Sequence, residues 1–368
     1  MLVSLTLKKK NRIRELCQQI LHDKSSVIRD VAKLLGYFSS SFVAVRFGKL
    51  HYRNLERDKI EALRLSKGNF DALMHISELA RKDIEWWRDN ILDSSNEIYH
   101  GIPSITLSTD ACNTGWGAVL DAYKTHGLFS YEERDEHINQ LELRAILYGL
   151  GSLVDCTNSH IKILCDNTTS VFCINNMGSC KSLGCDSLAK QIWHWAIRCE
   201  NWITASYIPG HLNEEADTES RRDEFRLEWK LKEEVFVEIM KHFEFEPDID
   251  LFASRLNTQL EKFVSFRPDP EAKHVNAFTI PWTGQNVYLF PPFSCINRIV
   301  QRFSHESVSA VIIVPNWPNQ LWYPCLMDMT PKKPFLIHHS VSKIYLPSNP
   351  QIHHPLKQLE LMACLVLT

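Results

Sequence analysis

The sequence lacks the features that mark secreted, membrane-spanning or disulfide-stapled proteins. Its 368 residues hold no apolar run of transmembrane length, and the start, Met1 to Lys10, does not have the order of a signal peptide. Eleven cysteines include no Cys-x-x-Cys pair, which argues against a zinc knuckle and against a disulfide framework. We therefore expect an intracellular protein of the cytoplasm or nucleus, not secreted, with reduced thiols and no membrane partner.

Proline is scarce before residue 240 and frequent after it, which indicates that the chain is organised differently in its last third. Fourteen of the 16 prolines lie beyond residue 240, so the last third is loop-rich and separately organised. The chain is too long for one ordinary core, and 44% hydrophobic with 23% charged residues is typical of a globular protein. We expect a helical module at 1–98, a central domain at 102–226, a helical linker at 227–246 and a further unit at 247–368.

Charge is unevenly distributed behind the net value of −3. Residues 1–90 carry 18 Lys and Arg against 11 Asp and Glu, a balance of +7, whereas residues 101–226 carry 10 against 17, a balance of −7. A basic arm beside an acidic body suits a nucleic-acid clamp next to a metal-dependent site. Uneven helix surfaces are the alternative explanation.

The first module has helical periodicity and little strand signal. Apolar spacing predicts helices within residues 8–38, 50–65 and 70–90. Trp86 and Trp87 are adjacent on the last of these, so they point in different directions and only one can pack in the core. We favour packing over base stacking for this pair.

The central domain changes to period-two patterning with short turns. The predicted order is βββαβααβα, which describes a mixed sheet with helices packed on it. The expected strands are 105–110, 117–121, 127–131, 161–165 and 203–208, and the expected helices are 138–150, 170–176, 186–200 and about 213–222. A loop at 178–184 separates the second and third helices. Strands expected in the last unit are 248–252, 287–290, 310–314 and 335–339, after a linker helix at 228–242.

Asp110 stands at the end of the first strand, before the turn that contains Gly115 and Gly117. A buried aspartate is costly unless something positive faces it, and the next basic residue along the chain is Lys124. A metal ion is therefore a candidate partner. The alternative is that Asp110 only caps the turn.

Three further acids lie where strands end or helices begin: Glu142, Asp166 and Asp217. Each has a structural alternative, respectively a capping-box-like helix start three residues after Asn139, an ordinary helix cap, and a solvated helix residue. If the four carboxylates share one site, they repel unless divalent cations lie between them. That number of hard oxygen ligands suits Mg²⁺, with Mn²⁺ as a substitute, rather than zinc.

The motifs around these acids carry a family resemblance. They are Ser-Thr-Asp-Ala with Gly-Trp-Gly, Asn-Gln-Leu-Glu-Leu, Cys-Asp-Asn, and Ile-Pro-Gly-His-Leu-Asn-Glu-Glu-Ala-Asp at 208–217. The segment 104–222 resembles the ribonuclease H domain of retroelement reverse transcriptases. The resemblance implies a ribonuclease H-like mixed five-stranded sheet and cleavage of the RNA strand of RNA–DNA hybrids by two metal ions.

The same resemblance implies roles for individual residues. The four metal-binding carboxylates correspond to Asp110, Glu142, Asp166 and Asp217, with Asp110 as the bridging ligand. Asn139 matches a position that contacts a ribose 2′-hydroxyl, which distinguishes RNA from DNA. His211 resembles a mobile histidine near the scissile phosphate, and a loop histidine without a role is its alternative.

The flanking units resemble parts of DIRS-like retrotransposon polyproteins. The helical module is similar to a thumb and connection region, and no Tyr-x-Asp-Asp pair precedes it. We therefore expect the reverse transcriptase palm to be a missing upstream partner. The last unit resembles an adenine-methyltransferase-like domain, but Phe290 precedes Pro291-Pro292 where a hydrogen-bond acceptor is needed, which predicts a degenerate domain.

Three functional hypotheses follow. The first is an Mg²⁺-dependent hybrid ribonuclease, carried by the four carboxylates. The second is a catalytically silent nucleic-acid-binding remnant, motivated by the absent palm and the degenerate last unit. The third is methylation by the last unit, which only the Pro291-Pro292 motif supports.

Overall fold

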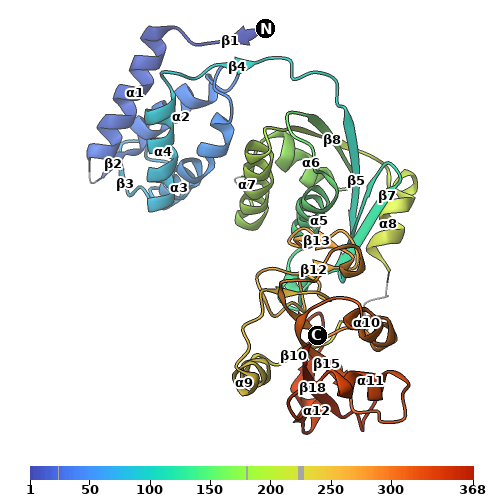
Figure 1. Cartoon of the computed structure of the whole chain (residues 1–368). Helices are drawn as coiled ribbons and strands as arrows, with labels where there is room; N and C mark the ends of the chain where they lie inside the picture. Colours follow the sequence, from blue (N-terminus) through green and yellow to red (C-terminus); the bar gives the residue numbers. More distant parts are fainter. Residues whose placement is uncertain (24, 180, 223–227) are drawn as a thin grey trace. The chain divides into compact units, whose positions relative to one another are not determined.

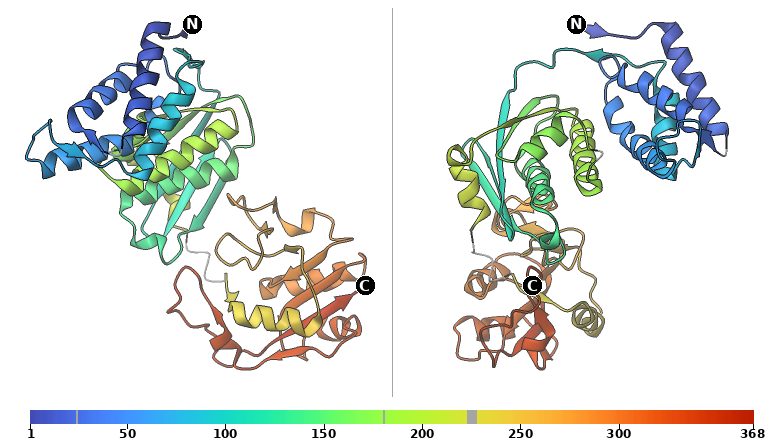
Figure 2. Two further views of the ribbon diagram at one scale, coloured as in Figure 1. Left: turned by 90° about the vertical axis from the view of Figure 1, so that its left-hand side faces the viewer. Right: turned by 180° about the vertical axis from the view of Figure 1, so that it is seen from behind.

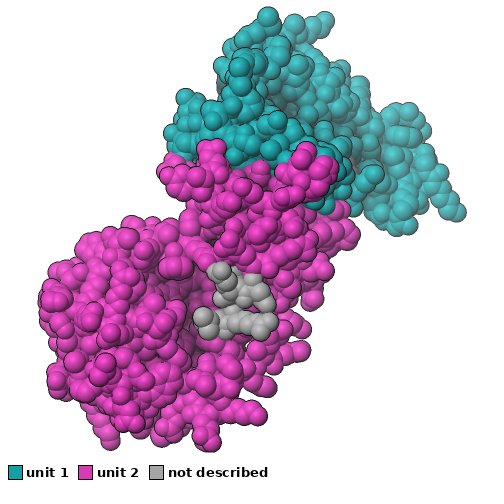
Figure 3. All heavy atoms as spheres, turned by 90° about the vertical axis from the view of Figure 1, so that its right-hand side faces the viewer, with its two compact units in different colours: residues 1–107, 156–209 teal, residues 108–155, 210–368 magenta. Residues whose placement is uncertain are grey.

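The computed structural model describes residues 1–23, 25–179, 181–222 and 228–368. It divides the chain into two compact units, residues 1–107 with 156–209 and residues 108–155 with 210–368 (Figure 3). The expected domain boundary at 226/227 lies outside the described residues. Among the helices that are described, none has both the length and the hydropathy to cross a lipid bilayer.

The first unit begins with the helical module, drawn in blue in Figure 1. Its elements are β1 (Leu2–Val3), α1 (Leu7–His22), β2 (Ser26–Val27), α2 (Ile28–Ser39), η1 (Gly48–His51), α3 (Arg53–Leu65), β3 (Leu73–Met74), α4 (Glu78–Asn90) and β4 (Asn96–Glu97). The core holds Trp87, which stacks on Phe38 with ring centroids 4.2 Å apart. Trp86 instead stacks on His51, which confirms that only one tryptophan of the pair enters the core.

The helix expected over 70–90 is shorter than predicted. Ser77 is the N-cap, and its side chain accepts a hydrogen bond from the Ala80 N–H at 3.2 Å, so α4 begins at Glu78. Leu73 and Met74 instead form β3, which pairs with β2. The spacing of Phe70, Leu73 and Ile76 imitates a helix, but the first two of these side chains are exposed.

The rest of the first unit contains β8 (His160–Cys165), α6 (Thr168–Asn175), α7 (Leu183–Arg198) and β9 (Trp202–Tyr207). Strands β8 and β9 pair in parallel. Helices α6 and α7 are separate, as predicted; residue 180, which falls between them in the sequence, lies outside the described residues. Arg57 of α3 forms an ion pair with the buried Asp186 of α7, which ties the helical module to this part of the unit.

The second unit contributes β6 (Gly115–Leu120), β7 (Tyr123–Leu128), η2 (Glu133–Asp135), α5 (Ile138–Leu153), η3 (Gly210–Leu212) and α8 (Glu214–Ser220). With β5 (Ile105–Ala111), the strands follow the order β7-β6-β5-β8-β9. Antiparallel β6–β7 and parallel β8–β9 make this a mixed sheet. The predicted ribonuclease H-like five-stranded sheet with flanking helices is confirmed.

Strand β7 starts earlier than the expected 127–131. Leu120 pairs directly with Tyr123, so only Asp121 and Ala122 form the turn. Asp121 has φ +53°, in the left-handed region that such tight hairpin turns require. The turn is therefore shorter than the sequence indicates, and the strand begins at Tyr123.

The remainder of the second unit, here called the tail domain (residues 228–368), is built on a second five-stranded sheet (Figure 2). Its order is β11-β14-β15-β18-β16, formed by β11 (Ile249–Asp250), β14 (Asn286–Leu289), β15 (Ser309–Pro315), β18 (Leu361–Leu367) and β16 (Phe335–Ile337). The first three strands are parallel, and β18 runs antiparallel to both of its neighbours. The sequence interpretation missed β18.

Alternate residues of the tail sheet enter two hydrophobic clusters, one on each face. Val287 and Leu289 pack with α10 (Ile296–Phe303) and α11 (Trp322–Asp328), whereas Tyr288 packs with α9. Helix α9 (Glu233–Phe243) is the observed part of the linker helix expected at 228–242. The smaller elements are β10 (Lys230–Leu231), β12 (Val264–Ser265), β13 (His274–Val275), η4 (Ala277–Thr279), η5 (Phe293–Cys295), α12 (Ser340–Lys343) and β17 (Ile344–Tyr345).

Candidate functional site

Asp110 is the penultimate residue of β5 and is only 5% exposed. Its Oδ2 accepts a hydrogen bond of 2.6 Å from Ser220 Oγ, at the end of α8. The hairpin turn that follows is closed by Cys112, whose N–H donates to the Gly115 carbonyl at 2.9 Å and whose Sγ accepts from the Gly115 N–H at 3.3 Å. The turn thus has its own closing bonds, and the carboxylate of Asp110 is directed towards α8.

Helix α8 lies directly on β6, and glycine makes this possible. A Cβ atom on Gly117 would lie 2.5 Å from both the Ala216 carbonyl oxygen and the Ser220 nitrogen. No side chain fits in that space without moving the helix. A further bond of 2.9 Å from Asn213 Nδ2 to the Thr109 carbonyl holds the start of α8 against β5. The Gly-Trp-Gly segment therefore sets the position of the helix that carries Asp217.

Asp217 is on α8, with its side chain 41% exposed. Its Oδ1 lies 2.7 Å from Arg221 Nε. Hydrogen bonding to Asp217, and to a smaller extent the charge of Asp110, raises the pKa of Arg221 above its ordinary value. The next basic residue along the chain, Lys124, is therefore not the cation to consider for Asp110, because folding brings in Arg221, which is distant in sequence. Arg221 is 64% exposed, so it can move away.

Glu142 lies on α5, where it is 4% exposed. The N-cap of α5 is His137, whose Nδ1 accepts a hydrogen bond from the Asn139 N–H at 3.1 Å. No acidic residue lies in the first turn of this helix. The capping-box alternative for Asn139 and Glu142 is therefore wrong, because the helix starts one residue after His137.

Asp166 directly follows β8 and is half-buried. The cap of α6 is its neighbour Asn167, whose Oδ1 accepts from the Ser170 N–H at 2.9 Å. Asp166 is therefore not the helix cap. Among the described residues, Glu142, Cys165 and Asp166 each offer one ligand atom within 4.8 Å of the other two. The sequence interpretation placed Cys165 in the Cys-Asp-Asn motif but did not name it as a metal ligand; its Sγ accepts from the Asn167 N–H at 3.3 Å.

The two expected substrate contacts lie on different elements. Asn139 is half-buried in the first turn of α5. His211 is exposed in η3, the short turn that leads into α8. Their expected roles stay predictions.

Behind α5 lies a buried ionic cluster, which we call the Glu133 cluster: Glu133, Arg144, Tyr148 and Arg255. Arg144 and Tyr148 are on α5, and Arg255 comes from the tail domain; all three contact the Glu133 carboxylate. Burial alone would raise the pKa of Glu133, but Arg255 and the hydrogen bonds to the carboxylate lower it below its ordinary value. No motif marks this cluster, because its members are up to 122 residues apart.

A second contact of the tail domain reaches α8. His126 of β7 is 2.7 Å from Glu219 Oε2 through its Nδ1, and both side chains are almost fully buried. Arg267 of the tail domain contacts the same imidazole. Burial and Arg267 lower the pKa of His126 to about 4. The tail domain thus contacts the surroundings of both α5 and α8, the helices that carry Glu142 and Asp217.

Comparisons with known proteins agree with this location. Residues 106–222 match a protein-family model described as "Reverse transcriptase-like". The comparison with curated proteins gives no match.

Three solved structures illustrate what the fold is similar to. RNase H1 from the halophilic archaeon Halobacterium salinarum is 16% identical and aligns over 31% of this chain and 92% of its own, with a TM-score of 0.27. LC11-RNase H1 in complex with an RNA/DNA hybrid is 17% identical and aligns over 32% of this chain and 93% of its own, with a TM-score of 0.27. The foamy viral protease-reverse transcriptase in complex with RNA/DNA hybrid is 10% identical and aligns over 55% of this chain and 27% of its own, with a TM-score of 0.23. Residues 106–222 match a reverse transcriptase-like family model, and the five-stranded sheet that they help to form is ribonuclease H-like.

Proposed function

We propose that this chain is an RNA–DNA hybrid ribonuclease that hydrolyses the RNA strand by metal-dependent catalysis, with Asp110, Glu142, Asp166 and Asp217 as the metal ligands. The observation that carries the proposal is the burial of Asp110 and Glu142, which are 5% and 4% exposed. Keeping a carboxylate charged in a buried position is costly. A divalent ion would offset that cost at both residues.

The donor set fits a hard divalent cation. The four proposed ligands are all carboxylates, and oxygen donors are those that Mg²⁺ and Mn²⁺ prefer. Two such ions, when bound, would activate a water molecule and stabilise the leaving 3′ oxygen. Two thiols lie close to these carboxylates, and both sulfurs already bond to the backbone. Cys165 Sγ accepts from the Asn167 N–H, and Cys112 Sγ donates to the Ser220 carbonyl at 3.1 Å.

Other residues of the chain orient these groups. Ser220 holds one oxygen of Asp110 and thereby fixes the carboxylate orientation. On α5, Asn139 would accept or donate to the ribose 2′-hydroxyl, which separates RNA from DNA. His211, exposed ahead of α8, would assist proton transfer at the scissile phosphate.

The test is cleavage of a hybrid with a labelled RNA strand by the full chain, in Mg²⁺ and in Mn²⁺. We expect the wild type to cut RNA in the hybrid and to leave the same RNA in a duplex of two RNA strands intact. Asp110→Asn and Asp166→Asn should each abolish cleavage, since loss of a catalytic ligand removes several kcal/mol of transition-state stabilisation. The exposed Asp155→Asn is the matched control, and it should cut like the wild type.

The second candidate is a nucleic-acid-binding remnant without catalysis. The ion pair between Asp217 and Arg221 favours it, because an arginine on a ligand position can replace a metal. Salt-dependent binding of hybrid without cleavage in either metal would support this second function and refute the first.

We also propose the organisation of the chain: a thumb/connection-like module at 1–98, the ribonuclease H-like domain at 102–226, a linker at 227–246, and a degenerate methyltransferase-like domain at 247–368. In this proposal the chain derives from a DIRS-like retrotransposon polyprotein whose reverse transcriptase palm is its partner. Phe290, directly after β14, offers no acceptor for a target amine. The contacts of Arg255 and Arg267 support a structural role for the tail domain instead.

A further inference from the structure

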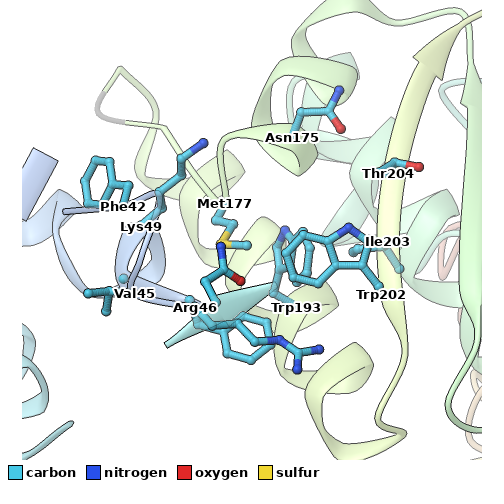
Figure 4. Close-up of a pocket in the computed structure, with 13 residues that line it drawn as sticks. Phe42, Val45, Arg46, Lys49, Asn175, Met177, Trp193, Trp202, Ile203 and Thr204 are labelled. Atoms are coloured by element: carbon cyan, nitrogen blue, oxygen red, sulfur yellow. The ribbon is translucent and has the colours of Figure 1, made fainter. Parts of the chain in front are cut away.

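A pocket of about 170 Å³ lies inside the first unit, between the helical module and the edge of the sheet (Figure 4). We call it the Arg46 pocket. The loop between α2 and η1 forms one side, and β9 with the neighbouring face of α7 forms the other. The lining residues that matter here are Arg46, Phe47, Lys49, Asn96, Trp193 and Trp202. The catalytic proposal uses none of them.

Two polar atoms that belong to this lining are buried without a hydrogen-bond partner among the described residues. They are Arg46 Nε, a donor, and Asn96 Oδ1, an acceptor. The other end of the Asn96 amide donates to the Val43 carbonyl at 3.2 Å, which fixes the orientation of the group. Both atoms are shielded from solvent, so a ligand in the pocket reaches them only when the two side chains turn towards it. Buried polar atoms are normally satisfied, and a ligand that offers a donor and an acceptor would then satisfy both.

The pocket also carries uncompensated positive charge. Neither Arg46 nor Lys49 forms an ion pair within the described part of the chain, and the guanidinium of Arg46 lies 5.5 Å from the Trp202 ring centroid and 4.9 Å from that of Phe47. Burial and the neighbouring Arg53 lower the pKa of Lys49. An anionic ligand in the pocket would offset the repulsion between the positive charges of Lys49 and Arg53.

The walls are rigid and aromatic. Trp193 and Trp202 meet edge to face at 5.1 Å, and His100 stacks on Trp202 at 3.5 Å. Phe47 has φ +65°, an uncommon conformation for a bulky residue. The next residue, Gly48, approaches the Trp87 ring so closely that a Cβ atom would lie 2.7 Å from it. The loop is therefore held in a strained shape by the module core, as is common at binding sites.

These features select one kind of ligand. The volume is below the roughly 300–1,000 Å³ of sites for drug-sized molecules, so a single ring system fits. Aromatic walls are the usual surface for an unpaired nucleobase, and cations beside them suit its phosphate. A base edge offers an amine for Asn96 and an acceptor for Arg46. An apolar peptide side chain meets neither of these needs.

We propose that the Arg46 pocket binds an unpaired nucleobase of a nucleic-acid strand, with the adjoining phosphate at Lys49. The proposal deepens the nucleic-acid function proposed above and rests on it for the identity of the strand. The site would hold a single-stranded extension of the hybrid, whose RNA or DNA strand supplies the base.

The test compares two hybrids in EDTA, which prevents cleavage: a blunt one and one with a single-stranded extension, RNA or DNA. Binding to the full chain is measured by fluorescence anisotropy. We expect the extension to tighten binding by about tenfold, and Arg46→Gln, Lys49→Gln and Asn96→Leu each to remove most of that gain. The exposed Lys82→Gln, on α4 of the same module, removes an equal charge and should keep the gain.

A second measurement does not depend on the variants. An extension that carries 5-iodouracil should crosslink on irradiation to Phe47 or Trp202, as mapped by mass spectrometry. Equal affinity for both hybrids, or crosslinks only outside the pocket, would overturn the proposal. A different result would be that the wild type fails to cleave the hybrid in Mg²⁺ while the extension still tightens binding in an Arg46-dependent way. That result would refute the proposed ribonuclease and still support the proposed base-binding pocket.

Discussion

Arg255 of the tail domain holds both carboxylate oxygens of Glu133, with Nη2 2.9 Å from Oε2 and Nη1 3.1 Å from Oε1. The two side chains are 12% and 11% exposed. The guanidinium also lies 4.4 Å from the ring centroid of Tyr148 on α5. A two-pronged pair of this kind fixes geometry as well as charge. The tail domain is thereby joined to the helix that carries Glu142.

Replacement of Arg255 tests this connection. Arg255→Ala leaves Glu133 buried with one fewer counter-charge, and breaking a buried pair costs about 3–5 kcal/mol. We expect a lower free energy of unfolding by urea, together with weaker hybrid cleavage because α5 loses its support. Lys273→Ala, which removes an exposed cation of the same tail domain, is the control and should change little. If the two variants were equally stable, the Glu133 cluster would not hold the unit together.

Ser220 tests the orientation of Asp110. Ser220→Ala removes the 2.6 Å bond to Asp110 Oδ2 while the backbone of α8 is retained. Outer-shell partners of this type affect metal affinity by about 10–100-fold. We expect Mn²⁺ binding, followed by electron paramagnetic resonance, to weaken within that range. Ser187→Ala on the exposed face of α7 should bind Mn²⁺ like the wild type; the same affinity in both variants would contradict the proposed metal site.

Gly117 tests the close approach of α8. Gly117→Ala puts a Cβ atom 2.5 Å from two backbone atoms of the helix, and backbone cannot yield as a side chain can. Overpacking of this kind destabilises by about 1–3 kcal/mol, and the displaced helix should also reduce cleavage. Gly36→Ala in α2 meets no atom within 4 Å, and it should stabilise by about 0.5–1 kcal/mol because alanine favours helix. The stability of both variants is measured by thermal unfolding and compared with that of the wild type. A Gly117→Ala protein as stable as the wild type would refute the steric argument.

Asp250 gives the tail domain a pH dependence. Burial raises the pKa of Asp250 to about 7 from 3.8, so its contribution to stability is complete below pH 3.8 and is lost as the pH rises through about 7. The slope in that window is about 1.4 kcal/mol per pH unit. Asp250→Asn has no carboxyl group to titrate. We expect its melting temperature to be higher than that of the wild type at pH 8 and similar to that of the wild type at low pH. Glu246 is exposed, so Glu246→Gln should show the same dependence of melting temperature on pH as the wild type. If Asp250→Asn also showed the wild-type dependence, Asp250 would not be the source of the pH effect.

Much of the central domain was predictable from local pattern. Period-two alternation at 105–110 and helical spacing at 138–150 correspond to β5 and α5, because each element buries one face and the sequence must repeat with its geometry. Predictions failed where a local signal was ambiguous. Phe70 and Leu73 have helical spacing but are exposed, and the β6–β7 turn is shorter than its residues indicate.

The sequence by itself determined the kind of fold and predicted the four carboxylates as a site, because strand and helix periodicity and the motifs around each acid are local properties of the chain. Only the tertiary structure decided what surrounds them. Ser220 and Arg221 approach Asp110 and Asp217 because α8 packs on β6 at Gly117. Arg255 reaches Glu133 across 122 residues. Such contacts depend on the packing of elements that are distant in sequence, and no local pattern encodes which of them will meet.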